Sequence, residues 1–423
     1  MNAFANNSRR TLCLSLVLPI LTVLCGLSPD AAMAQWTQWG GPKQDFKADS
    51  KGLASTWPEG GPKKLWTRAL GEGYSAILVD NGKLYTMYRS EDNMEAVVAL
   101  DAQSGKTLWE TKYDHSPAEG HVEQFGKGPR STPLIAGDQL YTVGVGGRLT
   151  CLNKNDGKEV WSKELWKDMK GSVLNHGYSS SPIEYKDTII ILVGGENQSF
   201  VAFNKKDGSI AWKNQSYGNS YSTPKLINLE GEDQLVTFLA TEIVGVDPKN
   251  GDLKWSYPHE NQWKQNVCMP ILGPDNILFF SALEAGSRGL KLTKAGDKTE
   301  IKEVWQSRKI QFYHVNSVAV GDYVYGSTGS GQGPSFFAAL DMKTGKVAWR
   351  ERGFSKATCV YADGKFIILD EDGQLGLANC TPEKFEIVSQ ATILDKVAWT
   401  VPTVVGKTLY VRDQKNIMAF DIG

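Results

Sequence analysis

Short apolar runs alternate with tight-turn dipeptides along most of the chain. One such unit reads Leu134-Ile135, then a Gly-Asp turn, then the apolar run Leu140–Val143. Runs of this length, bounded by Gly, Asp and Asn, are typical of antiparallel strands joined by hairpins. No segment of any length shows the period of a helix. The pattern therefore predicts an all-β fold.

An eleven-residue phrase recurs in the chain. It contains a small residue, an apolar residue, Asp or Asn, two variable residues, a polar residue, Gly, three variable residues and Trp. Its five full copies are Ala99–Trp109, Cys151–Trp161, Ala202–Trp212, Gly245–Trp255 and Ala339–Trp349. We interpret each copy as a hairpin in which Gly accepts a positive φ and Trp packs against the neighbouring unit.

The spacing of the tryptophans indicates what the hairpins build. Trp305 joins the series, and successive members lie 43 to 52 residues apart. That period is close to the period of propeller blades, each a four-stranded antiparallel sheet. Two repeats are degenerate: residues 267–305 contain a longer hairpin, and residues 357–390 lack the Trp but keep the strand pattern.

The two ends of the repeat region complement each other. Residues 419–423 are the first half of the phrase, and residues 63–67, which contain Trp66, supply the missing half. An N-terminal strand that completes the last blade closes a ring and removes its exposed edges. We therefore predict an eight-bladed β-propeller that occupies residues 63–423 as one domain.

The first 34 residues differ from the rest. Arg9 and Arg10 precede an apolar run from Leu12 to Leu27, and Ala32-Met33-Ala34 follows. This order predicts a signal peptide, residues 1–34, cleaved before Gln35, and a periplasmic or secreted protein. A membrane anchor is the alternative, and the paired arginines leave the export route open between general secretory and twin-arginine. We expect residues 35–62, rich in Gly, Pro and Trp, to form an irregular cap on the ring.

Charge and cysteine content narrow the function. With 46 Lys and Arg against 47 Asp and Glu, the chain lacks the basic excess that binds nucleic acid. Four cysteines follow the signal segment, with spacings too wide for a zinc site. We expect buried thiols, although an oxidising compartment permits a disulfide. These four are Cys151, Cys268, Cys359 and Cys380.

The phrase Ala-x-Asp-x-x-(Thr/Ser)-Gly-Lys-x-x-Trp resembles the tryptophan-docking motif of quinoprotein-type (PQQ-like) eight-bladed β-propellers, and the resemblance covers about residues 63–423. The motif positions are Trp66, Trp109, Trp161, Trp212, Trp255, Trp305 and Trp349. The family implies the propeller fold. It is less specific for chemistry, because it includes pyrroloquinoline quinone (PQQ) dehydrogenases as well as non-enzymatic members such as the outer-membrane assembly factor BamB.

The loops that enter the innermost strands are expected to meet on one rim of the central channel. Their cationic, amide and aromatic groups are suited to an anionic planar ligand. Ordinary solvated loops explain the same polarity, and Trp399 with Tyr74 also suggests carbohydrate or polymer binding. The candidate ligand-binding residues are Arg130, His176, Asn266, His314, Asn316, Lys356 and Trp399.

The catalytic alternative lacks its expected parts. The resemblance implies that a quinoprotein dehydrogenase would need an adjacent-cysteine disulfide, Ca²⁺ ligands and an Asp base. The chain has no Cys-Cys pair, and Glu72 is the acidic residue we find at the rim entries. Asp370-Glu371-Asp372-Gly373 is interpreted as a hairpin turn, since the distal Glu of a calcium loop is missing. No catalytic residue and no metal site is predicted.

These observations favour a monomeric binding or scaffold module in the cell envelope, with an envelope protein, a small molecule or a polymer as its partner. A PQQ-dependent dehydrogenase that oxidises an alcohol or sugar, with PQQ and Ca²⁺ as cofactors, is the alternative. Carbohydrate or polymer binding is the third function considered.

Overall fold

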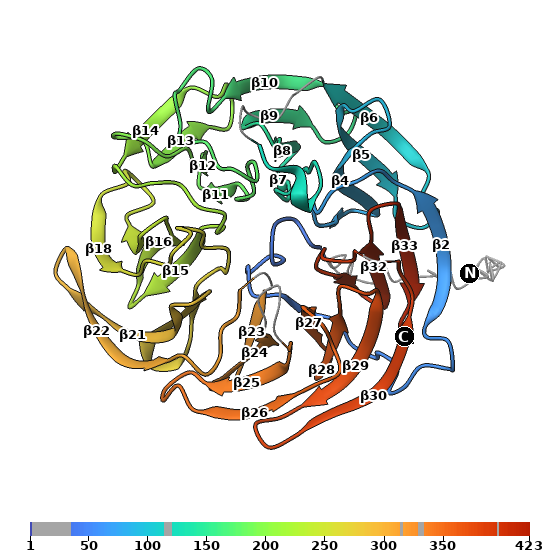
Figure 1. The fold of residues 1–423 in the computed structure, drawn as a ribbon. Coiled ribbons are helices and arrows are strands. Elements are labelled where there is room, and N and C mark those ends of the chain that lie inside the picture. The colour runs from blue at the N-terminus through green and yellow to red at the C-terminus, as the bar shows by residue number, and fades with distance from the viewer. Residues whose placement is uncertain (2–34, 114–120, 314–315, 329–333, 396) are drawn as a thin grey trace. The chain divides into compact units, whose positions relative to one another are not determined.

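The computed structural model describes Met1 and residues 35–113, 121–313, 316–328, 334–395 and 397–423. The chain divides into residues 1–33 and residues 34–423. Apart from Met1, the first unit lies outside the described residues, so the signal peptide stays a prediction. In the described part of the second unit, eight antiparallel sheets stand around a centre as the blades of a propeller (Figure 1).

Each of the first four blades has four strands that follow one another from the centre outward. Blade 1 contains β3 (Leu78–Asp80), β4 (Lys83–Arg89), β5 (Glu95–Asp101) and β6 (Thr107–Tyr113). Blade 2 contains β7 (Leu134–Ala136), β8 (Gln139–Val143), β9 (Arg148–Asn153) and β10 (Glu159–Glu164). Blade 3 contains β11 (Ile183–Tyr185), β12 (Thr188–Leu192), β13 (Phe200–Asn204) and β14 (Ile210–Asn214). Blade 4 contains β15 (Lys225–Leu229), β16 (Glu232–Phe238), β17 (Glu242–Val246) and β18 (Leu253–Pro258).

The remaining blades repeat this order, with additions from the N-terminal region in the last two. Blade 5 contains β19 (Ile271–Leu272), β20 (Ile277–Ala282), β21 (Gly286–Ala295) and β22 (Lys298–Ser307). Blade 6 contains β23 (Ser317–Val320), β24 (Tyr323–Ser327), β25 (Phe337–Asp341) and β26 (Val347–Glu351). Blade 7 contains β27 (Thr358–Ala362), β28 (Lys365–Leu369), β29 (Gln374–Cys380) and β30 (Phe385–Thr392), and β1 (Lys47–Ala48) pairs with β27. Blade 8 contains β31 (Thr403–Val405), β32 (Thr408–Arg412), β33 (Asn416–Asp421) and β2 (Lys63–Ala69).

Helix is confined to two short 3₁₀ turns in the described residues. They are η1 (Glu123–Phe125) and η2 (Pro274–Asn276). Neither turn is long enough to cross a bilayer, and no other helix occurs between residue 35 and the C-terminus in the described ranges. The sequence-based prediction of an all-β eight-bladed propeller is confirmed.

The repeated tryptophans join neighbouring blades. Trp109 of blade 1 lies against Gly157 of blade 2, where an added Cβ would stand 2.4 Å from the indole, and φ of Gly157 is +72°. Glycine is therefore required there both for space and for conformation. The Trp109 indole N–H donates to the carbonyl of Lys154 at 2.9 Å. Equivalent hydrogen bonds to the next blade are made by Trp66, Trp161, Trp305 and Trp349.

Blade 4 makes this connection differently. Trp255 donates instead to Gln234 Oε1 of its own blade at 2.9 Å. Gln234 Nε2 then reaches Thr299 Oγ1 of blade 5 at 2.8 Å. The longer β21–β22 hairpin of blade 5 accounts for the change, because its Gly296 has no neighbour within 4 Å to stack upon it. A buried side-chain relay thus replaces the direct contact.

The ring closes between the two ends of the repeat region. Strand β2 pairs antiparallel with β33, and Trp66 stands opposite Ala419. The Trp66 indole donates to the Ala102 carbonyl of blade 1 at 3.1 Å. The predicted closing strand is therefore present, and it carries the docking contact from the last blade to the first.

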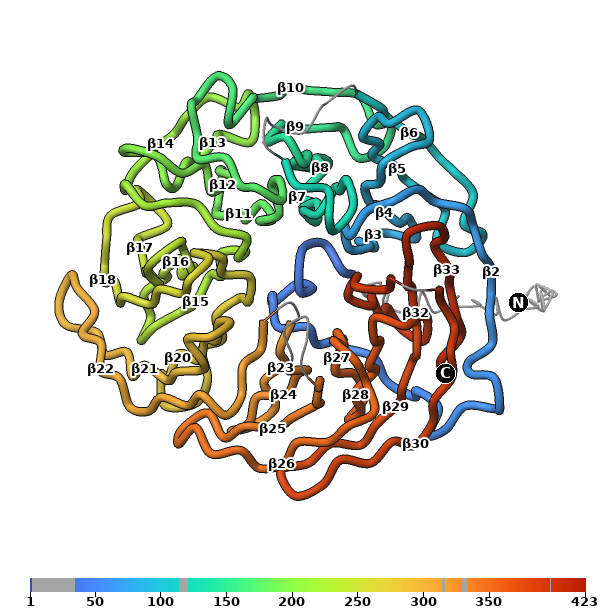
Figure 2. The backbone as a smooth tube through the Cα atoms, in the orientation of Figure 1, coloured from blue at the N-terminus to red at the C-terminus, as the bar shows by residue number. Residues whose placement is uncertain are grey.

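In the view of Figure 2 the segment before β2, drawn as a blue tube, crosses the centre of the ring. Trp36 and Val79 exchange two main-chain hydrogen bonds of 2.9 Å. Further on, Ile135 donates to the Thr37 carbonyl and Tyr361 donates to the Phe46 carbonyl. Gln44 Oε1 accepts from the Leu226 N–H at 3.3 Å. These contacts link the innermost strands of blades 1, 2, 4 and 7.

Candidate functional site

Residues at one repeat position lie where the chain enters the innermost strands. Each of these residues lies five positions before a residue of the innermost strand of its blade, as Tyr74 lies five before Val79 of β3. They are Tyr74, Arg130, Tyr221, Lys356 and Trp399. The N-terminal segment contacts the innermost strands themselves, at Val79, Ile135, Leu226 and Tyr361. Tyr74 and its four counterparts instead share one repeat position at the entries to those strands, which we call the mouth of the channel.

Aromatic and cationic side chains gather at this mouth. The rings of Tyr74 and Trp399 stack with centroids 5.6 Å apart, and the Arg130 guanidinium lies 5.5 Å from the Tyr74 ring. Phe125 of η1 contacts both Trp399, at 6.0 Å, and His176, at 5.2 Å. His176 in turn lies 6.0 Å from Tyr221. We call the set Tyr74, His121, Phe125, Arg130, His176, Tyr221 and Trp399 the mouth cluster.

A buried carboxylate orients one side of the mouth cluster. Glu371 accepts hydrogen bonds from Lys356 Nζ at 3.1 Å and from the Trp399 indole at 3.2 Å. Burial alone would raise the pKa of Glu371, but these bonds and that from Ser355 hold the pKa below its usual value. Lys356 also lies 5.8 Å from the Trp399 ring. The Lys356–Glu371 ion pair therefore fixes the indole plane.

Glu371 corrects one part of the sequence analysis, which found Glu72 alone among the rim entries. It comes from the turn between β28 and β29, a part of the repeat not considered as rim. The interpretation of residues 370–373 as a hairpin turn is confirmed, since Asp370 Oδ1 accepts from the N–H groups of Asp372 and Gln374 at 3.0 and 2.9 Å.

The predicted site residues separate into three groups. Arg130, His176 and Trp399 meet in the mouth cluster, and Lys356 lies beside it. Asn266 instead donates to the Leu239 carbonyl at 2.7 Å and is fully buried. Asn316 bonds both main-chain groups of Cys359, its Nδ2 to the carbonyl at 2.8 Å and its Oδ1 to the N–H at 3.2 Å. His314 lies outside the described residues.

Sequence reasoning missed His121, Phe125 and Tyr221 as members of the cluster. Tyr221 occupies the same repeat position as Tyr74 and Arg130, so an alignment of the repeats identifies it. His121 and Phe125 belong to the long connection between blades 1 and 2. No repeat signal marks that connection, and its main chain is placed by the hydrogen bond from Val122 N–H to the Asn175 carbonyl, 2.7 Å long.

The residues present do not fit the calcium and quinone site that the family resemblance implies. Among the described residues no group of three or more His, Cys, Asp or Glu side chains is placed to hold a metal ion. None of the four described cysteines is paired in a disulfide, and Cys151, Cys268 and Cys359 are buried. Burial raises the pKa of Cys268 to about 12. Glu371, the acidic side chain that contacts Trp399, is already bonded to Lys356. We therefore derive no step through PQQ.

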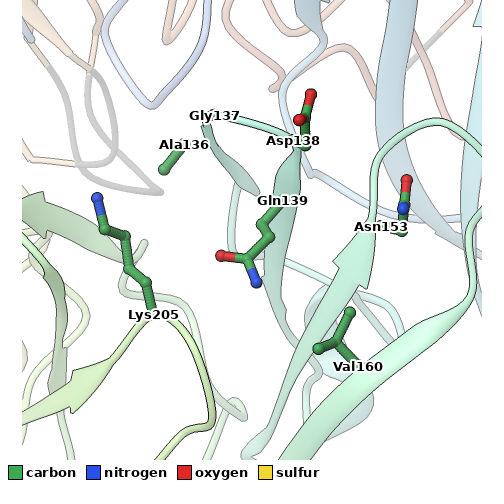
Figure 3. Close-up of a pocket in the computed structure, with 7 residues that line it drawn as sticks. All are labelled: Ala136, Gly137, Asp138, Gln139, Asn153, Val160 and Lys205. Carbon is green, nitrogen blue, oxygen red and sulfur yellow. The ribbon is translucent and has the colours of Figure 1, made fainter.

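Two surface pockets lie outside the mouth cluster. One, of about 410 Å³, is lined by the β7–β8 turn, by Asn153 and Val160 of blade 2 and by Lys205 of blade 3 (Figure 3). The ammonium of Lys205 is bound to Glu184 at 2.7 Å, and its carbonyl accepts from the Trp161 indole. The other, of about 450 Å³, lies between blades 6 and 7 and includes Phe354 and Asp370. The first is thus a gap between blades whose charged group is already paired.

Known proteins share this architecture. The quinohemoprotein alcohol dehydrogenase of Comamonas testosteroni superposes with a TM-score of 0.63 at 13% identity, over 93% of this chain and 81% of that one. The quinohemoprotein alcohol dehydrogenase ADH IIB of Pseudomonas putida is 28% identical over 140 residues, which are 32% of this chain and 19% of that protein. These similarities show the fold.

Longer sequence matches are found to outer membrane protein assembly factors. BamB of Moranella endobia is 24% identical over 323 residues, covering 74% of this chain and 68% of the relative. BamB of Escherichia coli K12 is 22% identical over 307 residues, covering 68% and 72%. The family model described as outer membrane protein assembly factor BamB matches residues 93–351, more than half of the chain. This chain therefore belongs to the BamB family of PQQ-like repeat propellers.

Proposed function

We propose that this protein is an exported, non-catalytic scaffold of the cell envelope that binds a protein partner. The partner binds the surface around the mouth cluster, which we call the mouth face. The observation that carries the proposal is the aromatic and cationic mouth cluster, whose Tyr74, Trp399 and Arg130 are residue types that dominate binding energy at protein interfaces. The membership of the BamB family supports the envelope role, because its relatives are named as outer membrane assembly factors.

Three large apolar side chains in the connections between blades are exposed. Val122 follows His121 directly, Val173 lies in the connection that leads to His176, and Trp263 lies in the connection that leads to β19. Val173 is 49% exposed and Trp263 is 58% exposed. The connections between successive blades lie at the same end of the antiparallel blades, so these side chains share one face, and exposed apolar side chains on one face favour a protein interface.

The ion-paired state of Glu371 supports a binding role over catalysis. A general base must be free to take a proton, and Glu371 is held in its charged form by three hydrogen bonds. The same bonds make the Trp399 indole rigid. A rigid aromatic side chain loses little entropy on binding, which suits an interface anchor.

The test is co-purification from an envelope extract with matched variants. Val173→Ser alters the mouth face, and Ile210→Ser, equally exposed at 49% but on outer strand β14, is its control. A protein that co-purifies with the wild type and with Ile210→Ser, but not with Val173→Ser or Trp263→Ser, supports the proposal. A partner retained equally by all four proteins, or no retained partner, contradicts it.

A further inference from the structure

Arg130 is a largely buried cation that forms no ion pair with any acidic side chain of the described residues. Its Nη2 donates to the carbonyls of Phe125 and Gly126 at 3.2 and 3.0 Å, and its Nη1 has no hydrogen-bond partner. The described groups that act on its charge are the phenols Tyr74 and Tyr221. Burial raises the pKa of both phenols, so neither neutralises a cation. A buried charge that lacks a counter-ion is costly, so this arrangement is suited to an anion.

Two histidines share this environment. Both ring nitrogens of His121, and Nδ1 of His176, are buried and without a hydrogen-bond partner. The residue after His176 is Gly177, and an added Cβ there would stand 3.1 Å from the His121 ring. An added Cβ at Gly128 would stand 3.3 Å from Arg130 Nη1 and 3.0 Å from Val145 Cγ2, and an added Cβ at Gly177 would stand 2.2 Å from the same methyl group. The guanidinium and the His121 ring therefore both lie near the Val145 side chain, and His176 directly precedes Gly177. Buried polar atoms are normally paired, so several unpaired nitrogens together point to a missing ligand.

Arg412 is a second buried arginine, and its guanidinium has hydrogen-bond partners at both Nη atoms. Its side chain is fully buried, and its Nη1 donates to the Met87 carbonyl at 2.7 Å while Nη2 donates to the Gly71 carbonyl at 2.9 Å. Main-chain carbonyls thus satisfy both ends of this guanidinium. At Arg130, in contrast, main-chain carbonyls accept hydrogen bonds from Nη2 alone.

We propose that His121, Arg130 and His176 form a binding site for a small oxyanion, a carboxylate or a phosphate group. The guanidinium supplies the charge and a donor at Nη1, and each imidazole supplies a donor through one ring nitrogen. A positive guanidinium beside two imidazoles repels a metal cation, which separates this site from a metal centre. The inference goes beyond the scaffold proposal, since the site takes a free anion whether or not a protein binds the mouth face.

The charges around the histidines predict how binding responds to pH. Burial lowers the pKa of His121 and of His176, and the charge of Arg130 acts in the same direction on both, while a hydrogen bond with the Val122 main chain acts in the opposite direction on His176. Glu123 acts on His121 in the opposite direction, while Arg89 acts in the same direction as Arg130. A bound anion favours the protonated imidazole, so binding takes up protons and tightens as the pH falls.

The experiment is isothermal titration of the full mature chain in chloride buffer at constant ionic strength, with sodium phosphate and sodium acetate as separate ligands. We expect saturable binding of at least one of them, tighter at pH 6 than at pH 8. Which ligand binds distinguishes a phosphate site from a carboxylate site. Arg130→Gln should weaken binding about tenfold or more, the factor expected for a lost charge-assisted hydrogen bond. Arg352→Gln, an exposed arginine beside the pocket between blades 6 and 7, should bind like the wild type.

Thermal unfolding of the same proteins separates a ligand site from a structural role. In chloride buffer Arg130→Gln should unfold no earlier than the wild type, because it removes an unpaired buried charge. The anion should raise the Tm of the wild type and not that of the variant. His176→Asn, which keeps the arginine, should also weaken binding if Arg130→Gln does not fold. Absence of saturable binding by either anion, or equal binding by the wild type and these variants, overturns the proposal.

Discussion

The main-chain N–H of Trp57 donates to Ser389 Oγ at 2.8 Å, at the point where blade 7 lacks its docking tryptophan. In the other blades the strand register shifts directly after the pair that contains the Trp, as after Ala99 and Trp109. In blade 7 the shift follows the pair of Leu377 and Ser389, so Ser389 occupies the tryptophan position. The main chain of Trp57 thus contacts the position in blade 7 where the docking tryptophan is missing.

The first prediction concerns Trp57→Ala. Because Trp57 is 9% exposed and belongs to the main core cluster, its truncation should lower the free energy of unfolding by about 3–5 kcal/mol. Chemical denaturation measures the change. Trp263→Ala, which removes a tryptophan that is 58% exposed, should change stability by less than about 0.5 kcal/mol. Equal effects of the two substitutions would show that the segment that contains Trp57, residues 50–61, does not stabilise blade 7.

Ring closure predicts the effect of Trp66→Ala. The substitution removes the packing against Gly105 and the hydrogen bond to the Ala102 carbonyl, and should destabilise the protein by about 3 kcal/mol or more. Gly105→Ala tests the same contact from the other side, because φ is +70° and the new Cβ would stand 2.6 Å from the Trp66 ring. If both variants had the Tm of the wild type, ring closure through Trp66 would be contradicted.

His259 should make the protein sensitive to acid. It is buried, and burial together with the charge of Arg288 lowers its pKa to about 4, while Arg288 Nε donates to its Nδ1 at 3.0 Å. The folded state therefore binds this proton more weakly than the unfolded state does. The stability it contributes is full above pH 6.5 and is lost as the pH falls toward 4.

The measurement is the free energy of unfolding between pH 7 and 4 for the wild type and for His259→Gln. The difference between the two proteins should change by as much as about 3 kcal/mol over this range, which corresponds to a pKa lowered from 6.5 to about 4. A difference that is independent of pH would show that His259 does not titrate between the two states.

The Lys356–Glu371 pair predicts a local change in fluorescence. Glu371→Gln should release the Trp399 indole and shift its emission to longer wavelength, because a mobile indole at the mouth becomes more solvated. Subtracting the spectrum of Trp399→Phe isolates this residue from the other tryptophans. Lys384→Gln, whose exposed partner is Glu386, is the control for loss of an ion pair and should leave the emission unchanged. An unchanged Trp399 spectrum in Glu371→Gln would mean that packing alone positions the indole.

The propeller is predictable from sequence because its signals are local. Each hairpin carries its own turn glycine and its own tryptophan, and the split phrase at the two ends specifies the closing pair. The mouth cluster is partly predictable, since Tyr74, Arg130, Tyr221 and Trp399 share one repeat position. Side-chain direction is not local. Asn266 and Asn316 occupy comparable places in the sequence, but neighbouring carbonyls draw their amides away from the mouth.

Contacts made across long sequence distances could not be predicted. Glu371 reaches Trp399 from a different blade, and Trp57 reaches Ser389 over most of the chain. The path of residues 35–48 depends on main-chain hydrogen bonds with the inner strands of blades 1, 2 and 7 and on the Gln44 side chain, which accepts from Leu226 of blade 4, and no repeat marks these positions. Within residues 35–62 the structure has the two-residue strand β1, which pairs with β27, the innermost strand of blade 7, and the irregular cap expected for this segment stays a prediction.

The central claim, that this member of the family binds rather than oxidises, is tested most directly by adding PQQ and Ca²⁺ to the purified protein and following dye reduction with a panel of alcohols and sugars. The account predicts no substrate-dependent dye reduction at any PQQ concentration, even if PQQ binds as an anion at Arg130. Substrate-dependent reduction that saturates with PQQ would contradict it.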